Sequence, residues 1–449
     1  MFIADPSKLA KTEKERYLQM NSTQNKKIRQ VTEKTMIVGI DVGSVKHYFR
    51  AFDWRGIELT RRPIPFTNSM EGFNAFHDVV NDLMDKNNLE ITLVGLEPTG
   101  HYWFNLGQYM NGKNIKFVMV NPHHVHKSKE LDDNSPSKND CKDPKVIANL
   151  VRDGRYFYTY MPSGIYAELR NASNRRFTLV EEQVRCKNRI YKWISVYFPE
   201  YKGIYTHIDA KGGILLLKNA PTPEDIIEIG VEGIIKIWKD AKLRGNGHKK
   251  AITIFNRALN SIGFKEGLTE ARIEIKDLIE DYETQTKRLE QINDLIKNLT
   301  LQIKHVDKLL EIKGVGIITV AGFIAEVGDI TRFDNSKELQ KLAGLELVED
   351  SSGKHNGKTK ISKRGRKRLR YLLIQAAISV IGKNAEFKQI HNYYTTRNDN
   401  PLKKMQSVTA VACKLIRVFH VVLVKGVSYD ASKMLEDIKY PGGAKLIVA

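Results

Sequence analysis

The stretch TMIVGIDVGS, residues 35–44, combines a short apolar segment with a carboxylate and a glycine turn. Residues 36–40 are rich in β-branched side chains, and a short apolar run that ends at a turn signal is typical of a buried strand. Asp41 then lies at or near the strand end, where its side chain can leave the sheet and enter a site. A second apolar strand, residues 46–53, follows through a turn at residues 42–45. An aspartate that merely begins a turn explains this stretch alone equally well.

The whole chain is long and strongly basic. It has 449 residues, enough for about three domains of ~150 residues, and its formal net charge is +20. Such a charge favours a polyanionic partner, most often a nucleic acid. We expect no membrane segment, because no apolar span of ~20 residues and no signal peptide are apparent. The three widely spaced cysteines fit a reducing, cytoplasmic setting without a zinc site.

Strands and helices alternate after the first hairpin. The pattern predicts further strands at residues 57–63, 91–96 and 116–120, with helices at residues 70–86 and 101–111. The resulting order, βββαβαβ with acids at strand ends, resembles an α/β sheet of the ribonuclease-H/RuvC-like type. Nucleases of that type present their first metal-binding aspartate from a buried strand into a tight turn.

Four acidic residues occupy positions from which they can meet at one end of this sheet. Asp41 and Glu97 follow predicted strands, and Asp140 and Asp143 precede a predicted helix. Two Mg²⁺ ions need hard oxygen ligands, and a metal pair would orient the attacking and leaving oxygens of a phosphodiester. Close carboxylates repel one another unless a cation lies between them. Asp143 has a second interpretation as a helix N-cap, because Pro144 suits the first helical position.

Two long heptad patterns follow the sheet. Apolar residues recur at three- and four-residue spacing within residues 161–199, and again without a break within residues 268–310. Such persistence predicts coiled-coil helices. Residues 200–265 form a segment inserted between them. The sequence leaves open whether the two helices pair within one chain or between subunits.

The C-terminal part is predicted to be mostly α-helical, with two features that suit a nucleic acid. Gly314 and Gly316 lie in a stretch that resembles a helix-hairpin-helix, whose backbone N–H groups contact phosphate; a plain turn between helices is the alternative. Residues 354–370 carry nine Lys and Arg and no acid, which favours contact with a phosphate backbone. The residues predicted to bind nucleic acid are Gly314, Gly316, Lys354, Lys358, Lys360, Lys363, Arg364, Arg366 and Arg368.

Seven separated blocks resemble one known family, in the family's order. The family is the insertion-sequence transposases of the IS110 type, which combine a RuvC-like DEDD domain with a C-terminal serine domain. The blocks extend over about residues 36–430 and are GIDVGSVKHYF, LVGLEPTGHYW, VMVNPHHVHKSKELDDNSPSKNDCKDPKVIA, CKNRIYKWISVYFPEY, LLEIKGVGIITVAGFIAEVGDITRF, LAGLELVEDSSGKHNGKTKISKRGRKRLRYLLIQAA and PLKKMQSVTAVACKLIRVF.

This resemblance implies an activity and a set of site residues. It implies that the DEDD tetrad falls on Asp41, Glu97, Asp140 and Asp143, which would bind Mg²⁺ or Mn²⁺. It implies a nucleophilic serine at Ser352, with Ser351 as the alternative. It also implies that a homo-oligomer, a dimer or tetramer, recombines DNA at the element ends and a target, guided by a structured RNA encoded beside the gene. The protein would then act in the cytoplasm at the nucleoid. Pro144 stands where the family usually has alanine.

The expected domains are a flexible arm at residues 1–34, a RuvC-like DEDD domain at 35–160, a helical and coiled-coil region at 161–310, and a C-terminal transposase domain at 311–449. Two other functions remain open on the residues alone. A metal-dependent, structure-specific DNA nuclease would use the acids and not the serine. A non-catalytic nucleic-acid-binding scaffold would use the acids only as caps and turn residues.

Overall fold

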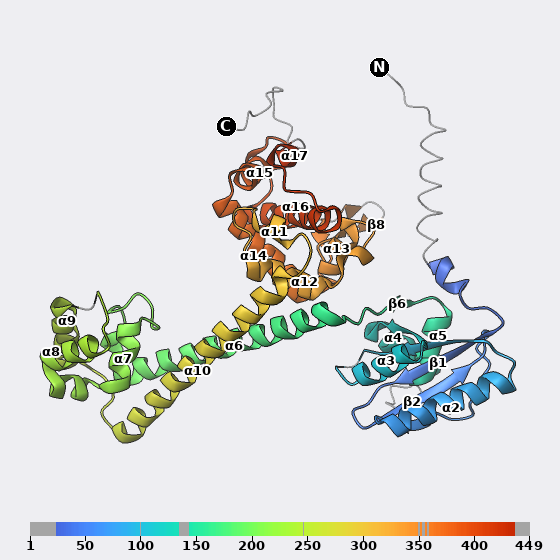
Figure 1. The fold of residues 1–449 in the computed structure, drawn as a ribbon, viewed down its shortest axis with the longest axis horizontal. Coiled ribbons are helices and arrows are strands. Elements are labelled where there is room, and N and C mark those ends of the chain that lie inside the picture. The colour runs from blue at the N-terminus through green and yellow to red at the C-terminus, as the bar shows by residue number, and fades with distance from the viewer. Residues whose placement is uncertain are drawn as a thin grey trace, which may run out of the picture. The chain divides into compact units, whose positions relative to one another are not determined.

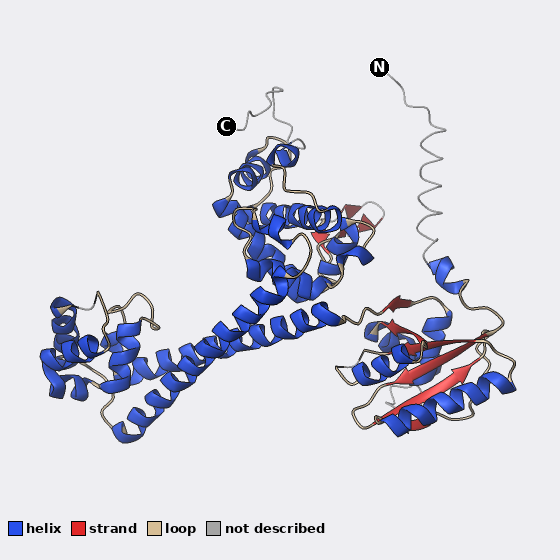
Figure 2. Cartoon of the chain, in the orientation of Figure 1, coloured by secondary structure: helices blue, strands red, loops and turns tan. Residues whose placement is uncertain are grey.

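The structure is a computed structural model, and it describes residues 24–98, 100–133, 143–245, 247–348, 351–352, 355–356 and 359–435. The chain divides between Met161 and Pro162 into two compact units. The first unit is a sheet with helices on both faces, and the second is mostly helical (Figures 1 and 2). The predicted combination of an α/β N-terminal part with a mostly α-helical C-terminal part is therefore confirmed.

Six strands form the sheet of the first unit, in the order β3-β2-β1-β4-β5-β6. The central strand β1 pairs antiparallel with β2 and parallel with β4, and β4 pairs parallel with β5. The carboxyl ends of β1, β4 and β5 therefore lie at the same end of the sheet. The strands are β1 Thr35–Asp41, β2 Lys46–Phe52, β3 Ile64–Thr67, β4 Ile91–Leu96, β5 Lys116–Val120 and β6 Tyr156–Tyr158.

The alternation of side chains along β1 separates two hydrophobic cores. Val38 and Ile40 pack in the core beneath α2 and α3, whereas Ile37 packs in the core beneath α4 and α5. Both faces of the central strand are therefore covered, which explains why it is a continuous apolar run. The helices are α2 Met70–Lys86, α3 Trp103–Gly112, α4 Pro122–Asp133 and α5 Asp143–Arg152.

Most of the predicted elements are present, with three differences. The third strand was predicted wrongly: β3 begins at Ile64, and the predicted stretch 57–63 contributes one isolated bridge, between Phe52 and Glu58. Pro63 has no N–H group to donate to a ladder, which disfavours a strand there. Helix α4 and strand β6 were not predicted, because one is polar with little periodicity and the other has only three residues.

Two helices of 34 residues each, α6 (Gly164–Tyr197) and α10 (Leu268–Leu301), run side by side in the second unit (Figure 1). Gln183 Nε2 donates to Thr286 Oγ1 at 2.9 Å, and Trp193 Nε1 donates to the Ala271 carbonyl at 2.9 Å. Residue numbers rise along one helix as they fall along the other, so the pair is antiparallel. The two heptad patterns thus pair within one chain.

The predicted single helix to residue 310 is interrupted. Helix α10 ends at Leu301, and the chain passes through His305, at φ +66°, before α11 begins at Val306. A left-handed residue cannot continue an α-helix. The heptad spacing continues across the break because α11 packs its apolar residues into the same core as the end of α10.

The two ends of the α6–α10 pair lie in two different hydrophobic cores. Helices α7 Lys211–Asn219, α8 Pro223–Asp240 and α9 His248–Leu259 pack with one end. The other end packs with α11 Val306–Leu310, α12 Ile317–Val327, α13 Ser336–Ala343, α14 Lys367–Lys383, α15 Ala385–Thr396, α16 Lys404–Lys425 and α17 Ala431–Leu435. Two short ladders precede α14, one between β7 Leu347–Val348 and β10 Lys360–Ile361 and the other between β8 Ser351–Ser352 and β9 His355–Asn356.

Helix α16 corrects one sequence-based expectation. No apolar span of membrane length was expected, yet α16 is long and apolar enough to cross a bilayer by length and composition. Val411, Leu415 and Phe419 on this helix are fully buried against the core of the second unit. Its apolar composition is therefore explained by its place as a core helix.

Candidate active site

Two of the predicted acidic residues lie at the ends of neighbouring parallel strands. β1 and β4 are in register at Gly39 and Gly95, so Asp41, two residues on, lies opposite Glu97, the first residue after β4. Side chains alternate along a strand, which places Asp41 on the face of Gly39 and Glu97 on the face of Gly95. Both carboxylates therefore belong to one face and one end of the sheet. Both are half-buried.

Helix α5 lies directly on that face. A Cβ atom on Gly39 would stand 1.9 Å from the carbonyl oxygen of Pro144, and one on Gly95 would stand 2.4 Å from Cγ2 of Val151. The two glycines thus let the helix backbone approach the sheet. Asp143, half-buried, directly precedes Pro144. The third predicted acid therefore begins a helix that is held against the strand carrying the first.

The two interpretations of Asp143 converge at this helix start. The sequence predicts that the helix begins at Pro144 with Asp143 as its N-cap, and the structure begins α5 at Asp143 itself, one residue earlier. A carboxylate in the first turn is favoured by the helix dipole. Asp143 could still be a metal ligand at this position, because a carboxylate has several acceptor sites and one capping hydrogen bond does not use all of them.

The predicted tetrad is not assembled within the described part of the chain. Asp140 lies outside the described residues. Among those that are described, no three His, Cys, Asp or Glu side chains form a group that could hold a metal ion. The donor chemistry of Asp41, Glu97 and Asp143 suits a hard divalent cation, since all three offer carboxylate oxygens. We refer to these three residues together with Asp140 as the acid site.

A second set of residues, which the sequence analysis missed, ties α5 to strand β2. The Glu58 carboxylate forms ion pairs with Arg50 Nη2 at 2.6 Å and with Lys145 Nζ at 3.3 Å. Arg50 is buried on β2, directly opposite Gly39 of β1. Lys145 lies two residues after Asp143. No motif signals this arrangement, because its three members come from separate elements and Glu58 was assigned to a strand.

The candidate nucleophile lies on a short hairpin in the second unit. The backbone of Ser351 and Ser352 forms β8, and Ser352 pairs with His355 of β9. The hairpin is flanked by the ladder of β7 and β10. The predicted phosphate contacts Lys354 and Lys358 lie outside the described residues.

The basic segment that follows divides into exposed and packed residues. Lys360, Lys363 and Arg364 are exposed. Arg366 Nη1 instead donates to the Glu326 carbonyl at 2.5 Å, and the Arg368 guanidinium lies 4.2 Å from the Phe177 ring centre. The two packed arginines therefore hold the start of α14 against α12 and α6.

The two predicted hairpin glycines differ in their surroundings. Gly314 has φ +98°, and its carbonyl accepts a hydrogen bond from Ser379 Oγ at 2.8 Å. A Cβ atom there would lie 3.0 Å from Val380 Cα, so Gly314 packs against α14. Gly316 is exposed, has open space around its Cα, and caps the N-terminus of α12. Gly316 therefore presents more of its backbone to solvent than Gly314, which is half-buried.

Two family comparisons match this chain, and they fall on both parts of it. Residues 38–199 match the DEDD transposase domain of the IS110 type, and residues 306–394 match the transposase domain of the IS116/IS110/IS902 family. Together the matched segments make up more than half of the chain.

Individual relatives agree with these matches. The uncharacterized 44.8 kDa protein of insertion element IS116 from Streptomyces clavuligerus is 24% identical over 291 residues, 64% of this chain and 71% of its own length. The transposase for insertion sequence element IS1111A of Coxiella burnetii is 33% identical over 23% of this chain and 26% of its own length. The transposase for IS1328 of Yersinia enterocolitica is 28% identical over 32% of this chain and 43% of its own length.

The DEDD transposase match contains the sheet with Asp41 and Glu97 at the carboxyl ends of its strands, and the second transposase match contains the basic segment of the helical part. The chain belongs to the IS116/IS110/IS902 family of insertion-sequence transposases.

Proposed function

We propose that this protein cuts and rejoins DNA strands at the ends of an insertion sequence, with the acid site and Ser352 as its catalytic groups. The observation that supports the acid site most strongly is the register of β1 and β4. It sets Asp41 and Glu97 side by side on the face where α5 presents Asp143. Residues more than forty positions apart in sequence would then approach the same phosphodiester.

The acid site would hold Mg²⁺ or Mn²⁺ through its carboxylates. A bound divalent cation would neutralise charge on the scissile phosphate and orient the reacting oxygens. The residues of the chain that surround it hold the acids in place: Gly39 lets α5 approach, and Glu58 ties Lys145 of α5 to Arg50.

Ser352 would supply the covalent step. Its Oγ attacks the phosphorus, its proton passes to a carboxylate of the acid site, and the P–O bond to the leaving strand breaks. The leaving strand keeps a free hydroxyl end. Attack of a strand-end hydroxyl on the phosphoserine restores Ser352 and joins the strands, so the phosphodiester energy is conserved and no external energy source is needed.

The charge of the chain and the family match support the remaining partners of this proposal. The net charge of +20 suits a protein that holds several phosphate backbones at once. We propose that a structured RNA encoded beside the gene selects the DNA, and that a homo-oligomer brings the serine of one protomer to the acid site of another.

A covalent-adduct assay tests the serine. The wild-type chain is incubated with Mg²⁺ and a supercoiled plasmid carrying the element ends, with and without the co-expressed RNA, and protein–DNA adducts are separated under denaturing conditions. Ser352→Ala should abolish the adduct and strand joining while DNA and RNA binding persist. Ser351→Ala is the matched control and should form the adduct. Recombination by Ser352→Ala would overturn the assignment of this serine.

The same assay tests the acid site and separates the alternatives. Asp41→Asn and Glu97→Gln should remove both cleavage and adduct, because each deletes a carboxylate charge with little change in shape. Hydrolytic cleavage without any adduct would favour a metal-dependent nuclease. Unchanged behaviour of both variants would favour a non-catalytic scaffold.

A further inference from the structure

A cleft of about 630 Å³ opens at the end of the sheet opposite the acid site. It surrounds the beginning of β5, whereas Asp41 and Glu97 lie at the carboxyl ends of β1 and β4. The cleft lies wholly within the first unit. Its volume is in the range of sites that enclose a small molecule or one unit of a polymer.

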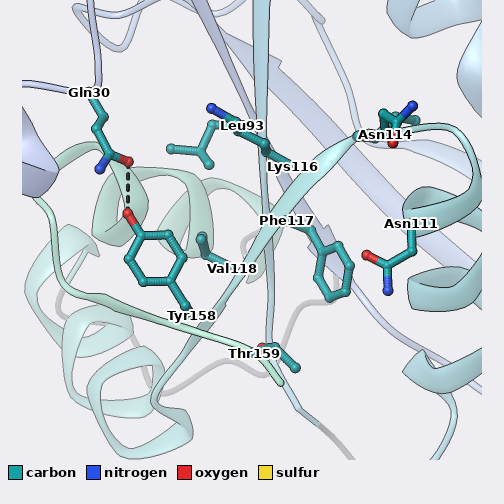
Figure 3. A pocket seen from close by; sticks show the side chains of 10 residues that line it. Gln30, Leu93, Asn111, Asn114, Lys116, Phe117, Val118, Tyr158 and Thr159 are labelled. Carbon is teal, nitrogen blue, oxygen red and sulfur yellow. Dashed lines mark hydrogen bonds between the residues drawn. The ribbon is translucent and has the colours of Figure 1, made fainter. Parts of the chain in front are cut away.

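The cleft exists because the edge strand is short. β6 pairs with β5 only as far as Tyr158 opposite Val118, and beyond that point the chain leaves the sheet. Within the described residues, no strand therefore lies beside the first residues of β5 on this edge. Figure 3 shows Gln30 and Tyr158 on one side of the strand and Phe117 and Asn111 on the other.

The polar groups at this cleft are of a particular kind. Three carboxamides line it, on Gln30, Asn111 and Asn114, together with the ammonium of Lys116. No Asp or Glu is among the described residues that line it. Amides donate and accept at once, and a lysine ammonium attracts a phosphate.

Two further observations favour ligand binding at this cleft. Tyr158 is 59% exposed, although its hydroxyl is fixed by donating to Gln30 Oε1 at 2.8 Å, so a rigid aromatic face is open to solvent. Thr159 Oγ1 is a buried oxygen that meets no hydrogen-bond partner in the described part of the chain. Most buried polar atoms in folded proteins have a hydrogen-bond partner, and a bound ligand could supply one here.

We propose that this cleft binds one unpaired nucleotide of a single-stranded nucleic acid. The base stacks on the Tyr158 ring, the Gln30 carboxamide and the Thr159 hydroxyl on the same side of β5 bond the base edge, and Lys116 contacts the adjoining phosphate. This proposal rests on the proposed function only in taking nucleic acid as the partner. A single-stranded RNA and a displaced DNA strand share this chemistry.

Binding of labelled oligonucleotides by the full-length protein tests the proposal independently of catalysis. Fluorescence polarisation is measured at fixed salt with single-stranded RNA, single-stranded DNA of the same sequence, and duplex DNA. Tyr158→Leu and Lys116→Gln should each weaken single-strand binding about five- to thirty-fold, as expected when one stacking or phosphate contact is lost. Duplex binding should not change.

Neighbouring residues provide matched controls. Phe157 is 48% exposed on the same strand but does not line the cleft, and Lys113 is an exposed lysine three residues before Lys116. Phe157→Leu and Lys113→Gln should bind like wild type. Tyr158→Phe keeps the ring and should retain most of the affinity, which separates loss of stacking from misfolding.

Photo-crosslinking with a 5-bromouracil oligonucleotide gives a second measurement. Crosslinks should map to Tyr158 and its neighbours, and a preference for RNA over DNA would identify the RNA as the source of the nucleotide. Equal weakening for both single strands also supports the proposal. Equal affinities of the cleft variants and their controls, or equal losses for duplex DNA, would overturn it whether or not the acid-site and serine experiments succeed.

Discussion

The carbonyl oxygen of Pro144 lies 1.9 Å from the point at which a Cβ atom on Gly39 would stand. Only glycine at that position in β1 allows the first turn of α5 to rest on the strand, and that turn carries Asp143. The two-residue spacing of Gly39 and Asp41 thus has a structural cause. Gly39 lets the helix backbone pack against β1, and Asp41 lies on the same face of the strand.

Gly39→Ala should displace α5 and separate Asp143 from Asp41. A methyl group forced against backbone atoms costs about 1–3 kcal/mol or more in the free energy of unfolding, and we expect DNA cleavage to be lost with it. Chemical denaturation and the plasmid assay measure the two effects. Gly112→Ala is the control, because nothing lies within 4 Å of its added Cβ. Wild-type cleavage by Gly39→Ala would show that the position of α5 does not matter.

Glu58 is not part of the acid site, but Glu58→Gln should disturb the position of the acid-site residues. Arg50 has a side chain only 11% exposed, so removing its carboxylate partner leaves a buried charge, and Lys145 loses its tie to the sheet. We expect a loss of about 1–2 kcal/mol in stability and a cleavage rate that falls further at low Mg²⁺ than at saturating Mg²⁺.

Glu90→Gln is the matched control for that experiment. Glu90 pairs with Lys34 at 3.2 Å on the surface of the same unit, with 68% of its side chain exposed. A surface pair of this kind contributes little, so neither stability nor cleavage should change. If Glu58→Gln lowered cleavage equally at every Mg²⁺ concentration, the network would not position the acids.

Sequence patterns predicted the candidate acids but not the residues that support them. Asp41 and Glu97 were chosen because each follows a short apolar strand, a pattern that depends on local residues alone. The pairing of Glu58 with Arg50 and Lys145 depends on three elements coming together, and no local pattern encodes it. The cleft at the start of β5 was missed for a related reason, because β6 has too few residues to show a period.

The basic segment shows the same limit. Its composition predicted that residues 354–370 bind phosphate along their whole length. Composition does not distinguish a lysine exposed to solvent from an arginine that packs on a neighbouring helix. The heptad pattern likewise predicted a helix to residue 310 but not the turn at His305, because the apolar spacing continues across it.

Replacing exposed and packed basic residues should therefore have different effects. The double variant Lys363→Ala/Arg364→Ala should keep its stability and lose nucleic-acid affinity, with the slope of log affinity against log salt reduced by about 2 if both contact phosphates. Salt titrations of DNA binding measure the slope. Lys276→Ala/Lys287→Ala, which removes two exposed charges from α10, should leave it nearly unchanged.

Arg368→Ala should instead lower stability. Its guanidinium packs on Phe177 and bonds Asn174, so its loss removes contacts between α14 and α6. We expect a cost of about 1–2 kcal/mol with a salt slope close to that of wild type. A large drop in slope with unchanged stability would mean that Arg368 contacts phosphate.

The last prediction concerns pH. His47 on β2 is fully buried between Phe66 and Phe73, with ring centres 5.0 and 6.0 Å away, and neither ring nitrogen meets a hydrogen-bond partner among the described residues. Burial lowers the pKa of His47 more than the nearby Asn68 side chain raises it. The unfolded chain therefore takes up a proton near pH 6.5 that the folded chain does not. The contribution of His47 to the free energy of unfolding is fully present above that pH. It should be lost as the pH drops below it, by at most about 1.4 kcal/mol per pH unit.

Urea unfolding of the protein between pH 7.5 and 5, followed by signals from the first unit, should show this decline, and His47→Phe should flatten it. His77→Gln, on α2, is the control and should keep the wild-type slope; an equally steep decline in His47→Phe would assign the pH dependence to other groups.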